Sequence, residues 1–543
     1  MLKHELDIDV LGCSFAISAE EEPEYLESLL EIYRKKLEDT RKSTGLSNEL
    51  KIAVLTGFLL CDECEKLRSE AFGNESSLRN RAEGKIQNDT DQNHEELREA
   101  EKLTLSLITR LNTILGDTPA ELGAGKHEDE EVFKLKNTVK NYDWGSADWI
   151  PELLGEENDA QIPCAELWMG VHPEGPSRII SGSKKNNEYP LLKDYITGDP
   201  EFFLGKEVEK TFGALPFLFK ILAVDKPLSI QAHPNLKEAL GGWERENLEA
   251  IPVNAPKRNY RDANHKPEII CALSPFTALI GFRESTEIRT LLELFLRKAP
   301  LTLQAGTSGL LKSLENRENP HRAFLEELFN LGPETREALG VHAVNHALDL
   351  QFDLDTAYQD EWKLTASLAR LYPGDPALIA PLYLNLIRLK PGEAVYIPSG
   401  ILHAYIHGQG VELMANSDNV LRGGLTPKHI DLPELFRILN FKASRPDILR
   451  EPDDSGDMYY RYPAPCREFS LFAVKNSSHI YSETGPAIII VTRGELAIRG
   501  KTGETILKKG ESAFIPAKHG SLQFSGNYTL YMAGIGFSNA NPG

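Results

Sequence analysis

The sequence predicts a multidomain protein with a mainly β C-terminal region, an inserted α-helical subdomain and a small α/β head at the N-terminus. Three observations predict this class. The chain has 543 residues, too many for one hydrophobic core. Beyond residue 130, short apolar runs recur between glycine and proline, which is typical of strands. Between about 283 and 376, apolar residues recur instead every three or four positions, which is typical of helices.

Composition restricts the partners and the location of the chain. A formal net charge of −21 argues against nucleic acid or an anionic membrane as the main partner. The longest apolar runs are far shorter than a membrane span, and the charged N-terminus lacks the apolar core of a signal peptide. Six cysteines are too few for a disulfide framework. We therefore expect a cytoplasmic protein.

The N-terminal segment begins with alternating apolar and polar residues. Residues 4–18 alternate like a strand or hairpin, with Gly12 at the expected turn. Residues 22–42 are typical of an amphipathic helix, and the apolar spacing from Ile52 to Leu67 predicts another. These elements place a small α/β head at residues 1–72.

Residues 73–117 combine a polar stretch with a helical pattern. Apolar residues from Leu97 to Ile114 alternate between three- and four-residue spacings, which is typical of a coiled coil. An amphipathic helix packed on its own domain would show the same short pattern. Residues 118–130 are small and acidic without apolar periodicity, and we expect a linker there.

Cys61 and Cys64 form a C-x-x-C pair, a spacing found in redox sites and in half of some zinc sites. They lie within a helical pattern, and no second pair completes a zinc site. We therefore favour ordinary helix cysteines.

Four short segments of this region resemble the ZapA family of bacterial cell-division proteins. They are Asp7–Phe15 (DIDVLGCSF), Glu24–Leu26 (EYL), Thr44–Ser47 (TGLS) and Ile52–Thr56 (IAVLT). The resemblance covers about residues 1–115. It implies a head with a coiled-coil tail that self-associates and bundles filaments of the tubulin-like protein FtsZ.

The C-terminal region divides into strand-like and helix-like runs. The clearest strand-like runs are Phe217–Ala223, Leu228–Ala232, Glu268–Leu273, Ala394–Pro398 and Ala487–Thr492. The helix-like runs are Ile288–Arg297, His321–Leu331, Glu334–Leu350 and Asp360–Leu371. We expect a catalytic domain at 131–282 and 377–455, a helical insertion at 283–376, and a last domain at 456–543.

Two segments of this region share one form. Gly392–His403 has five residues between glycine and Pro398, and a histidine five residues later. Gly510–Pro516 repeats the glycine-to-proline spacing, with His519 following. Both resemble a motif of cupins, jelly-roll barrels in which the turn after this strand can present a metal ligand. The second copy lacks a preceding Gln-x-His pair, so we expect His519 to be structural or at the surface.

Four side chains from three separated segments offer metal-ligand atoms. Gln231 and His233 lie two apart in a strand-like run, which directs both to one face. Glu268 follows Asn-His-Lys-Pro, and His403 ends the first cupin-like segment. Each alone has an ordinary alternative, such as a hydrogen-bonded core histidine. Together, two imidazoles, a carboxylate and an amide oxygen suit zinc or a similar divalent ion.

Charged residues near these segments suit a phosphorylated substrate. Lys266, Arg422 and Lys428 can hold a phosphate or a developing enediolate, and Ser229 can add a hydroxyl donor. Carboxylates suited to proton transfer are Glu412 and Asp418. An equally weighted alternative places Lys428 at the surface and pairs Glu412 with Arg422.

Longer motifs resemble type I mannose-6-phosphate isomerases over about residues 131–543. They are Tyr142–Gly145 (YDWG), Ala165–Gly170 (AELWMG), Ser229–Pro234 (SIQAHP), Asn264–Glu268 (NHKPE), His403–Ile406 (HAYI) and Glu412–Lys428 (ELMANSDNVLRGGLTPK). The family interconverts mannose 6-phosphate and fructose 6-phosphate. The resemblance implies one zinc ion held by Gln231, His233, Glu268 and His403.

The remaining residues of these motifs are expected to bind the substrate and to catalyse the reaction. Arg422 would stabilise charge near C1 and C2 of the sugar as a cis-enediol(ate) forms. Candidates for proton handling are Lys266, Asp418 and Glu412. Substrate-binding candidates are Ser229, Lys428, Tyr405 and His265. Alternatives to the isomerase are a sugar-phosphate-binding cupin without catalysis, an FtsZ-associated adaptor with a vestigial enzyme half, or two joined reading frames.

Overall fold

The computed structural model describes part of the chain. The described residues are 4–10, 13–19, 28, 30–38, 56, 60, 131–180, 189–350, 358–452, 458–476, 478, 480–481 and 483–536. They fall in two compact units, Met1–Thr118 and Pro119–Gly543. No helix among these residues is long and apolar enough to cross a membrane.

The first unit contains the hairpin that the alternating residues predict. Strands β1 (His4–Val10) and β2 (Cys13–Ala19) are antiparallel, with His4 opposite Ala19 and Val10 opposite Cys13. Residues 30–38 are helical, as expected from the amphipathic pattern. Our predictions for Cys61 and Cys64, the coiled coil and the linker lie outside the described residues.

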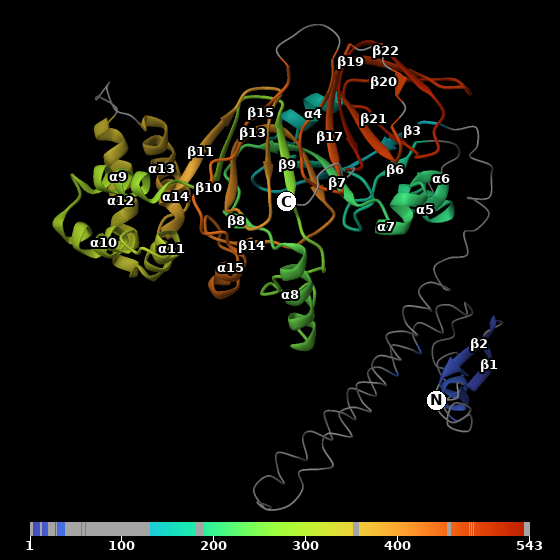
Figure 1. Ribbon diagram of the computed structural model, residues 1–543, viewed down its shortest axis with the longest axis horizontal. Coiled ribbons are helices and arrows are strands. Elements are labelled where there is room, and N and C mark those ends of the chain that lie inside the picture. The colour runs from blue at the N-terminus through green and yellow to red at the C-terminus, as the bar shows by residue number, and fades with distance from the viewer. Residues whose placement is uncertain are drawn as a thin grey trace, which may run out of the picture. The chain divides into compact units, whose positions relative to one another are not determined.

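The second unit is built on two antiparallel sheets (Figure 1). The eleven strands of the first sheet are β4 (Thr138–Lys140), β5 (Glu166–Met169), β7 (Phe217–Val224), β8 (Gln231–Ala232), β9 (Glu268–Ala272), β10 (Phe276–Phe282), β11 (Leu384–Leu389), β12 (Glu393–Ile397), β13 (His403–Ala415), β14 (Leu421–Arg422) and β15 (Leu449–Arg450). The nine strands of the second sheet are β3 (Phe133–Lys136), β6 (Arg178–Ile179), β16 (Met458–Arg461), β17 (Ser470–Lys475), β18 (Ile480–Tyr481), β19 (Ala487–Arg499), β20 (Glu504–Lys508), β21 (Ser512–Ile515) and β22 (Leu522–Gly534). The predicted mainly β class is confirmed.

Strand β13 organises the first sheet. Its second half, from Gly408 onward, pairs with β7 and β9, whereas its first half pairs with β10 and β8. Gly408 lies at the change of partner with φ +129°, and a Cβ there would come within 2.8 Å of Phe276. Only glycine fits this close approach and this backbone angle. The strand can therefore bend and hold both halves of the sheet together.

Strand β8 is shorter than predicted. The apolar run Leu228–Ala232 is expected to be a strand, but only Gln231 and Ala232 are assigned to one, and His233 lies beyond its end. The segment is bracketed by Pro227 and Pro234, which cannot donate to a sheet. Separate main-chain hydrogen bonds fix it instead, including Ile230 N to Gly424 O at 3.0 Å.

A group of helices lies at one end of the second unit, beside β10 and β11 (Figure 1). The chain leaves the first sheet after β10 and returns at β11, which pairs with β10. These helices are α9 (Ser285–Leu296), α10 (Leu301–Ser313), α11 (Pro320–Asn330), α12 (Pro333–Leu350) and α13 (Gln359–Leu371), followed by the short η2 (Pro376–Ile379) and α14 (Ala380–Tyr383). Four match the predicted runs. Helix α10 was missed because Gly306 and Gly309 interrupt its apolar pattern.

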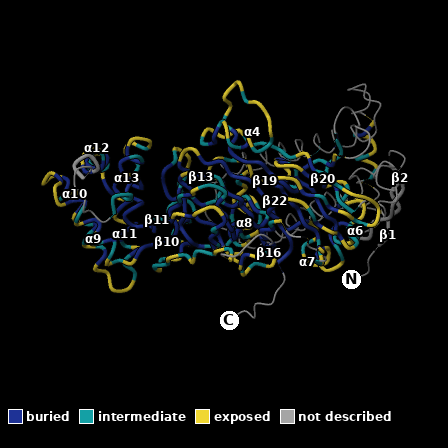
Figure 2. Tube along the Cα trace, turned by 90° about the horizontal axis from the view of Figure 1, so that it is seen from above, coloured by how far each residue is buried: buried dark blue, intermediate teal, exposed yellow. Residues whose placement is uncertain are grey.

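The remaining helices pack around the sheets. They are α4 (Trp149–Leu154), α5 (Leu192–Gly198), α6 (Pro200–Phe203), α7 (Lys206–Phe212), α8 (Leu236–Leu248) and α15 (Leu432–Ile438). Buried segments, dark blue in Figure 2, run through both sheets, and the exposed segments are chiefly loops.

The two sheets share one core. Phe217 and Phe219 of the first sheet belong to the same buried cluster as Ile488 and Phe514 of the second. Strand β3, from the start of the unit, pairs with β21 near its end. The last domain therefore receives strands from far upstream in the sequence, which periodicity alone cannot reveal.

Candidate metal centre and active site

Three buried side chains converge at the start of strands β9 and β13. One ligand atom from each of His233, Glu268 and His403 lies within 4.8 Å of the other two. The Nε2 of His233 is 3.3 Å from Glu268 Oε1, and the Nε2 of His403 is 3.4 Å from Glu268 Oε2. No more than 2% of any of the three side chains is exposed.

The other ring nitrogens determine what these histidines present to one another. His233 Nδ1 lies 2.7 Å from the carbonyl oxygen of Asn419, and His403 Nδ1 lies 2.9 Å from that of Ile401. A carbonyl only accepts, so each Nδ1 carries the hydrogen and each Nε2 is left with its lone pair. This arrangement is usual for histidines that bind metals.

The electrostatics of the cluster favour a bound cation. Burial lowers the pKa of His233 to about 4, so its ring is neutral at pH 7. Burial opposes ionisation of Glu268, but its interactions with His233 and Lys266 outweigh burial and hold the pKa of Glu268 well below its usual range. His233 Nε2 and Glu268 Oε2 make no hydrogen bond to a described residue. Lone pairs thus face one another in a buried space, and a metal ion would relieve their repulsion.

Gln231 supplies a fourth polar group. Its Nε2 lies 3.5 Å from His403 Nε2, and a half-turn of the amide would present Oε1 instead. Strand pairing sets this position, since Gln231 lies opposite His403 in one pair and opposite Arg422 in the other. The set of two imidazoles, a carboxylate and an amide oxygen fits zinc.

Gly400 fixes the turn before His403. Its φ of +79° and its closeness to Ile438, whose carbonyl oxygen would lie 2.9 Å from a Cβ, both require glycine. Its N–H donates to the carbonyl of His233 at 2.8 Å. The cupin-like motif therefore positions His233 as well as His403.

A pocket of about 630 Å³ opens beside the metal centre. Eight predicted site residues line it: Ser229, Gln231, Lys266, Glu268, Tyr405, Glu412, Arg422 and Lys428. His233 and His403 lie buried behind these lining residues. His265 and Asp418 do not line the pocket. The structure thus brings most of the predicted site together, while the role of each residue stays a prediction.

Arg422 and Lys428 form the cationic part of the pocket. Burial lowers the pKa of each, and the nearby charge of Arg261 lowers it further. Neither side chain makes an ion pair with a residue that the structure describes. Two cations of this kind, beside the Ser229 hydroxyl, can hold an anion such as a phosphate.

Lys220 is a buried cation that our sequence reasoning missed. Its Nζ lies 3.0 Å from Glu412 Oε2 and 3.7 Å from Glu166 Oε2. Burial lowers its pKa, but Glu166 and Glu412 outweigh this and raise the pKa above its usual range. The alternative that paired Glu412 with Arg422 is wrong, since Glu412 pairs with Lys220. The available signal was a lysine inside the apolar run 217–223, where an unpaired charge is rare.

Burial by itself lowers the pKa of Lys220, but it raises the pKa of two acidic groups in the pocket. It raises the pKa of Glu412, although Lys220 opposes this. It also raises the pKa of the Tyr405 hydroxyl, with the charges of Glu268 and Glu412 adding to the effect. A carboxyl with a raised pKa can accept and return a proton, and the neutral tyrosine can donate a hydrogen bond.

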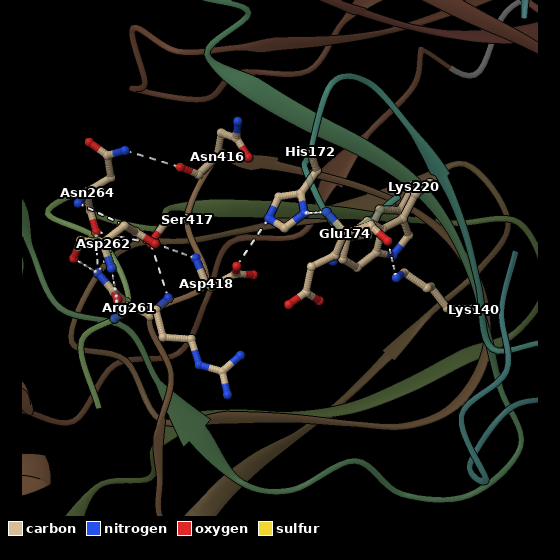
Figure 3. Close-up of polar contacts among 12 residues, drawn as sticks. Lys140, His172, Glu174, Lys220, Arg261, Asp262, Asn264, Asn416, Ser417 and Asp418 are labelled. Atoms are coloured by element: carbon tan, nitrogen blue, oxygen red, sulfur yellow. Dashed lines mark hydrogen bonds and ion pairs between the residues drawn. The ribbon is translucent and has the colours of Figure 1, made fainter. Parts of the chain in front are cut away.

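Asp418 faces His172 (Figure 3). His172 Nε2 lies 3.2 Å from Asp418 Oδ2. Burial opposes ionisation of Asp418, but the His172 hydrogen bond and charge lower its pKa. The Asp418 N–H also donates to Asp262 Oδ2 at 2.7 Å. Nothing in the sequence singled out His172.

His265 points to the C-terminal part of the chain. Its Nε2 lies 2.8 Å from Oε1 of Glu468, a residue 203 positions later. This placement argues against the predicted role of His265 as a substrate contact.

Family models match three parts of the chain. The type I phosphomannose isomerase catalytic domain matches residues 132–285, and the mannose-6-phosphate isomerase cupin domain matches residues 462–533. The cell division protein ZapA matches residues 6–105. All three lie where the sequence resemblances were found.

Individual proteins match most of the chain. Mannose-6-phosphate isomerase from Shigella flexneri is 39% identical over 404 residues, which cover 73% of this chain and 98% of that protein. The Bos taurus protein of the same name is 34% identical over 73% of this chain and 94% of its own length.

Solved structures agree with these matches. A zinc-bound mannose 6-phosphate isomerase shares 35% identity with a TM-score of 0.67, over 75% of this chain and 100% of that one. A phosphomannose isomerase from Salmonella typhimurium shares 35% identity with this chain and gives a TM-score of 0.66, over 75% of this chain and 100% of that one. With its buried His-Glu-His cluster and this coverage, the chain belongs to the type I mannose-6-phosphate isomerase family, and its N-terminal segment matches ZapA.

Proposed function

We propose that the region from residue 131 onward is a zinc-dependent isomerase that interconverts mannose 6-phosphate and fructose 6-phosphate. The observation that carries the proposal is a buried ligand cluster beside a pocket lined by Arg422 and Lys428, two cations that make no ion pair within the described part of the chain. The similar zinc-bound isomerase supports the choice of metal. Gln231, His233, Glu268 and His403 would hold the ion. When bound, zinc supplies a Lewis acid that polarises sugar oxygens.

The cations of the pocket bind and orient the substrate. Arg422 and Lys428 make no ion pair with a described residue, and Ser229 lines the same pocket. The substrate brings two anionic groups, which are its phosphate and the oxyanion that develops during the reaction. We assign the phosphate to Ser229 and Lys428, and the oxyanion near C1 and C2 to Arg422.

The isomerisation requires one group that removes a proton from carbon and one that returns it. A base removes the hydrogen from C2 of mannose 6-phosphate, and a cis-enediolate forms. The same proton returns to C1, while the proton on O2 is transferred to O1, which leaves the ketone at C2. We assign these steps to the carboxyl groups and Lys266, with Glu412 favoured because it lines the pocket and burial raises its pKa. Asp418, which His172 holds outside the pocket lining, is the less favoured candidate for proton handling.

The N-terminal segment is proposed as an association module. The match to ZapA covers residues 6–105, which include β2 and all of β1 except His4 and Glu5. We propose that it self-associates and binds FtsZ filaments, and that the chain acts in the cytoplasm. The proposed division of the chain keeps the expected head at 1–72 and linker at 118–130, but β3 and β6 join the C-terminal domain.

The isomerase is tested with full-length protein. Turnover of mannose 6-phosphate is measured in a coupled assay with and without chelator, alongside zinc content and hydrogen exchange at C2. We expect about one zinc per chain, turnover that chelation abolishes and zinc restores, and exchange at C2. Binding of the sugar without exchange would indicate a binding protein and overturn the proposal. Pelleting with FtsZ filaments tests the N-terminal module separately.

A further inference from the structure

We propose that Glu468, which lies just before β17 of the second sheet, is a positioning residue for the active-site loop 261–268 and acts through His265. The inference rests on the proposed function, because that function makes Lys266 of this loop part of the active site. It gives the C-terminal domain a part in the reaction.

Both oxygens of Glu468 are used. Oε1 accepts from His265 Nε2 at 2.8 Å, and Oε2 accepts from Cys466 Sγ at 2.9 Å. The side chains of His265 and Glu468 are only 26% and 19% exposed. Burial opposes ionisation of Glu468, but these two hydrogen bonds outweigh it and lower its pKa to about 2. The carboxylate is therefore charged and engaged at neutral pH.

The segment that carries Glu468 is rigidly attached to the first sheet. Tyr462 is fully buried, and its hydroxyl donates to the carbonyl of Gly392 at 2.8 Å. Cys271, on β9, donates to the same hydroxyl at 3.3 Å. Phe469, next to Glu468, is also fully buried. Glu468 thus extends from a segment that is fixed on both sides.

The active-site loop has a second attachment, from the first sheet. The carbonyl of Asn264 accepts from Ser417 Oγ at 3.1 Å and from Asn419 Nδ2 at 2.9 Å. His265 is the next residue, and Lys266 follows it. Glu468 lies outside the first sheet and holds the residue directly before Lys266.

Lys266 is the group whose position depends on this attachment. Its Nζ lies 3.3 Å from Glu268 Oε1, and it lines the pocket although only 8% of the residue is exposed. A buried ammonium group beside a metal-binding carboxylate must be placed within a fraction of an ångström to be useful. His265 does not line the pocket, and its Nε2 is taken up by Glu468. Both residues therefore act by positioning and not by contact with the sugar.

The test compares three variants of the full-length, zinc-loaded protein. Glu468→Leu removes the acceptor, whereas Glu468→Gln keeps an oxygen that can accept from His265. Glu504→Leu is the matched control, because Glu504 pairs with Arg499 on a neighbouring strand of the second sheet and is 39% exposed. We expect kcat to fall about 10- to 100-fold in Glu468→Leu, with zinc content unchanged, and KM to change much less. Glu468→Gln should recover most of kcat, and the control should match wild type.

A second measurement does not depend on activity. Amide hydrogen exchange of a peptide covering residues 261–268 should be faster in Glu468→Leu and in His265→Leu, but not in Glu504→Leu. Wild-type exchange and wild-type kcat in Glu468→Leu would overturn the inference. So would equal losses in Glu468→Leu and Glu468→Gln accompanied by loss of zinc, since that pattern marks a general structural defect. If wild type itself lacks isomerase activity, the proposed function fails, and the exchange experiment still decides whether Glu468 holds the loop.

Discussion

The two sheets of this chain each carry a Gly-to-Pro segment followed by a histidine, yet the two histidines lie in opposite surroundings. His403 has one ring nitrogen fixed by a carbonyl, and the other faces Glu268. His519 has both ring nitrogens within hydrogen-bonding distance of main-chain carbonyls, at 3.0 Å to Glu483 and 2.5 Å to Gly520. One nitrogen is available for a metal in the first case and neither in the second.

The surroundings of each histidine explain the difference. In the first sheet, His403 lies opposite Gln231, and β9 and the loop after β8 bring Glu268 and His233 beside it. In the second sheet, His519 packs against Tyr481, which stacks on Phe524. A shared turn thus places a histidine, but neighbouring segments decide whether it meets other ligands or an apolar core.

The largest effect is expected for the metal-ligand cluster of the first sheet. Replacing Glu268 with Gln removes the only carboxylate of the described His-Glu-His cluster, so metal affinity should fall and turnover should drop by about a thousand-fold or more. Zinc content and kcat are measured together. His519→Ala should keep both near wild type. Full zinc and full turnover in Glu268→Gln would show that the cluster is not the metal site.

Lys220→Met tests the buried ion pairs that lie beside the metal-ligand cluster in the first sheet. The substitution leaves the buried carboxylates Glu166 and Glu412 without their cation, and unfolding free energy should fall by about 3–5 kcal/mol. Urea denaturation of the zinc-loaded protein measures this. Adding Glu412→Gln should recover part of the loss, because one unpaired charge is removed. A single variant as stable as wild type would contradict the buried ion-pair network.

His519→Ala measures what the second sheet gains from its histidine. The ring contributes a main-chain hydrogen bond and a contact with Tyr481, so unfolding free energy should decrease by about 1 kcal/mol. Denaturant unfolding gives the value, and zinc content gives the control. Loss of zinc in this variant would mean that the second histidine also serves a metal, which would remove the contrast between the sheets.

The smallest effect concerns the contact that joins the two regions, and it depends on pH. The pKa of Glu468 is lowered from an ordinary 4.5 to about 2, so its stabilising contribution is complete above pH 4.5 and is lost as pH falls toward 2. The stability difference between wild type and Glu468→Gln should therefore shrink by about 1 kcal/mol or less between pH 6 and pH 3, because the pair is partly exposed. Denaturation of both proteins without metal measures it. A stability difference that stays constant with pH would show that the charge of Glu468 does not stabilise the fold.

Much of the fold and site could be predicted because local chemistry carries the signal. Alternation over residues 4–18 is enough for the hairpin, since side chains on a strand change face at every residue. Three- and four-residue spacing gave four of the helices around residues 285–371, but the glycines of α10 concealed a fifth. The strand expected at Leu228–Ala232 is mostly a segment held by single hydrogen bonds, because prolines bracket it.

The partners of charged groups could not be predicted in the same way. Glu412 was expected beside Arg422, but β7 lies next to β13 and brings Lys220 to it. His172 reaches Asp418, and Glu468 reaches His265, across 246 and 203 positions respectively (418−172 and 468−265). Such pairs depend on which strands become neighbours, and a single sequence does not state this.

The sequence by itself determined the types of group in the site and the class of the fold. Ligand types follow from what zinc binds, and strands and helices follow from the spacing of apolar residues. Only the tertiary structure decided which histidine faces a carboxylate, which lysine is buried between two glutamates, and that the C-terminal domain reaches the active-site loop. The reason is physical: interactions that need low dielectric and fixed distance exist only after distant segments have packed.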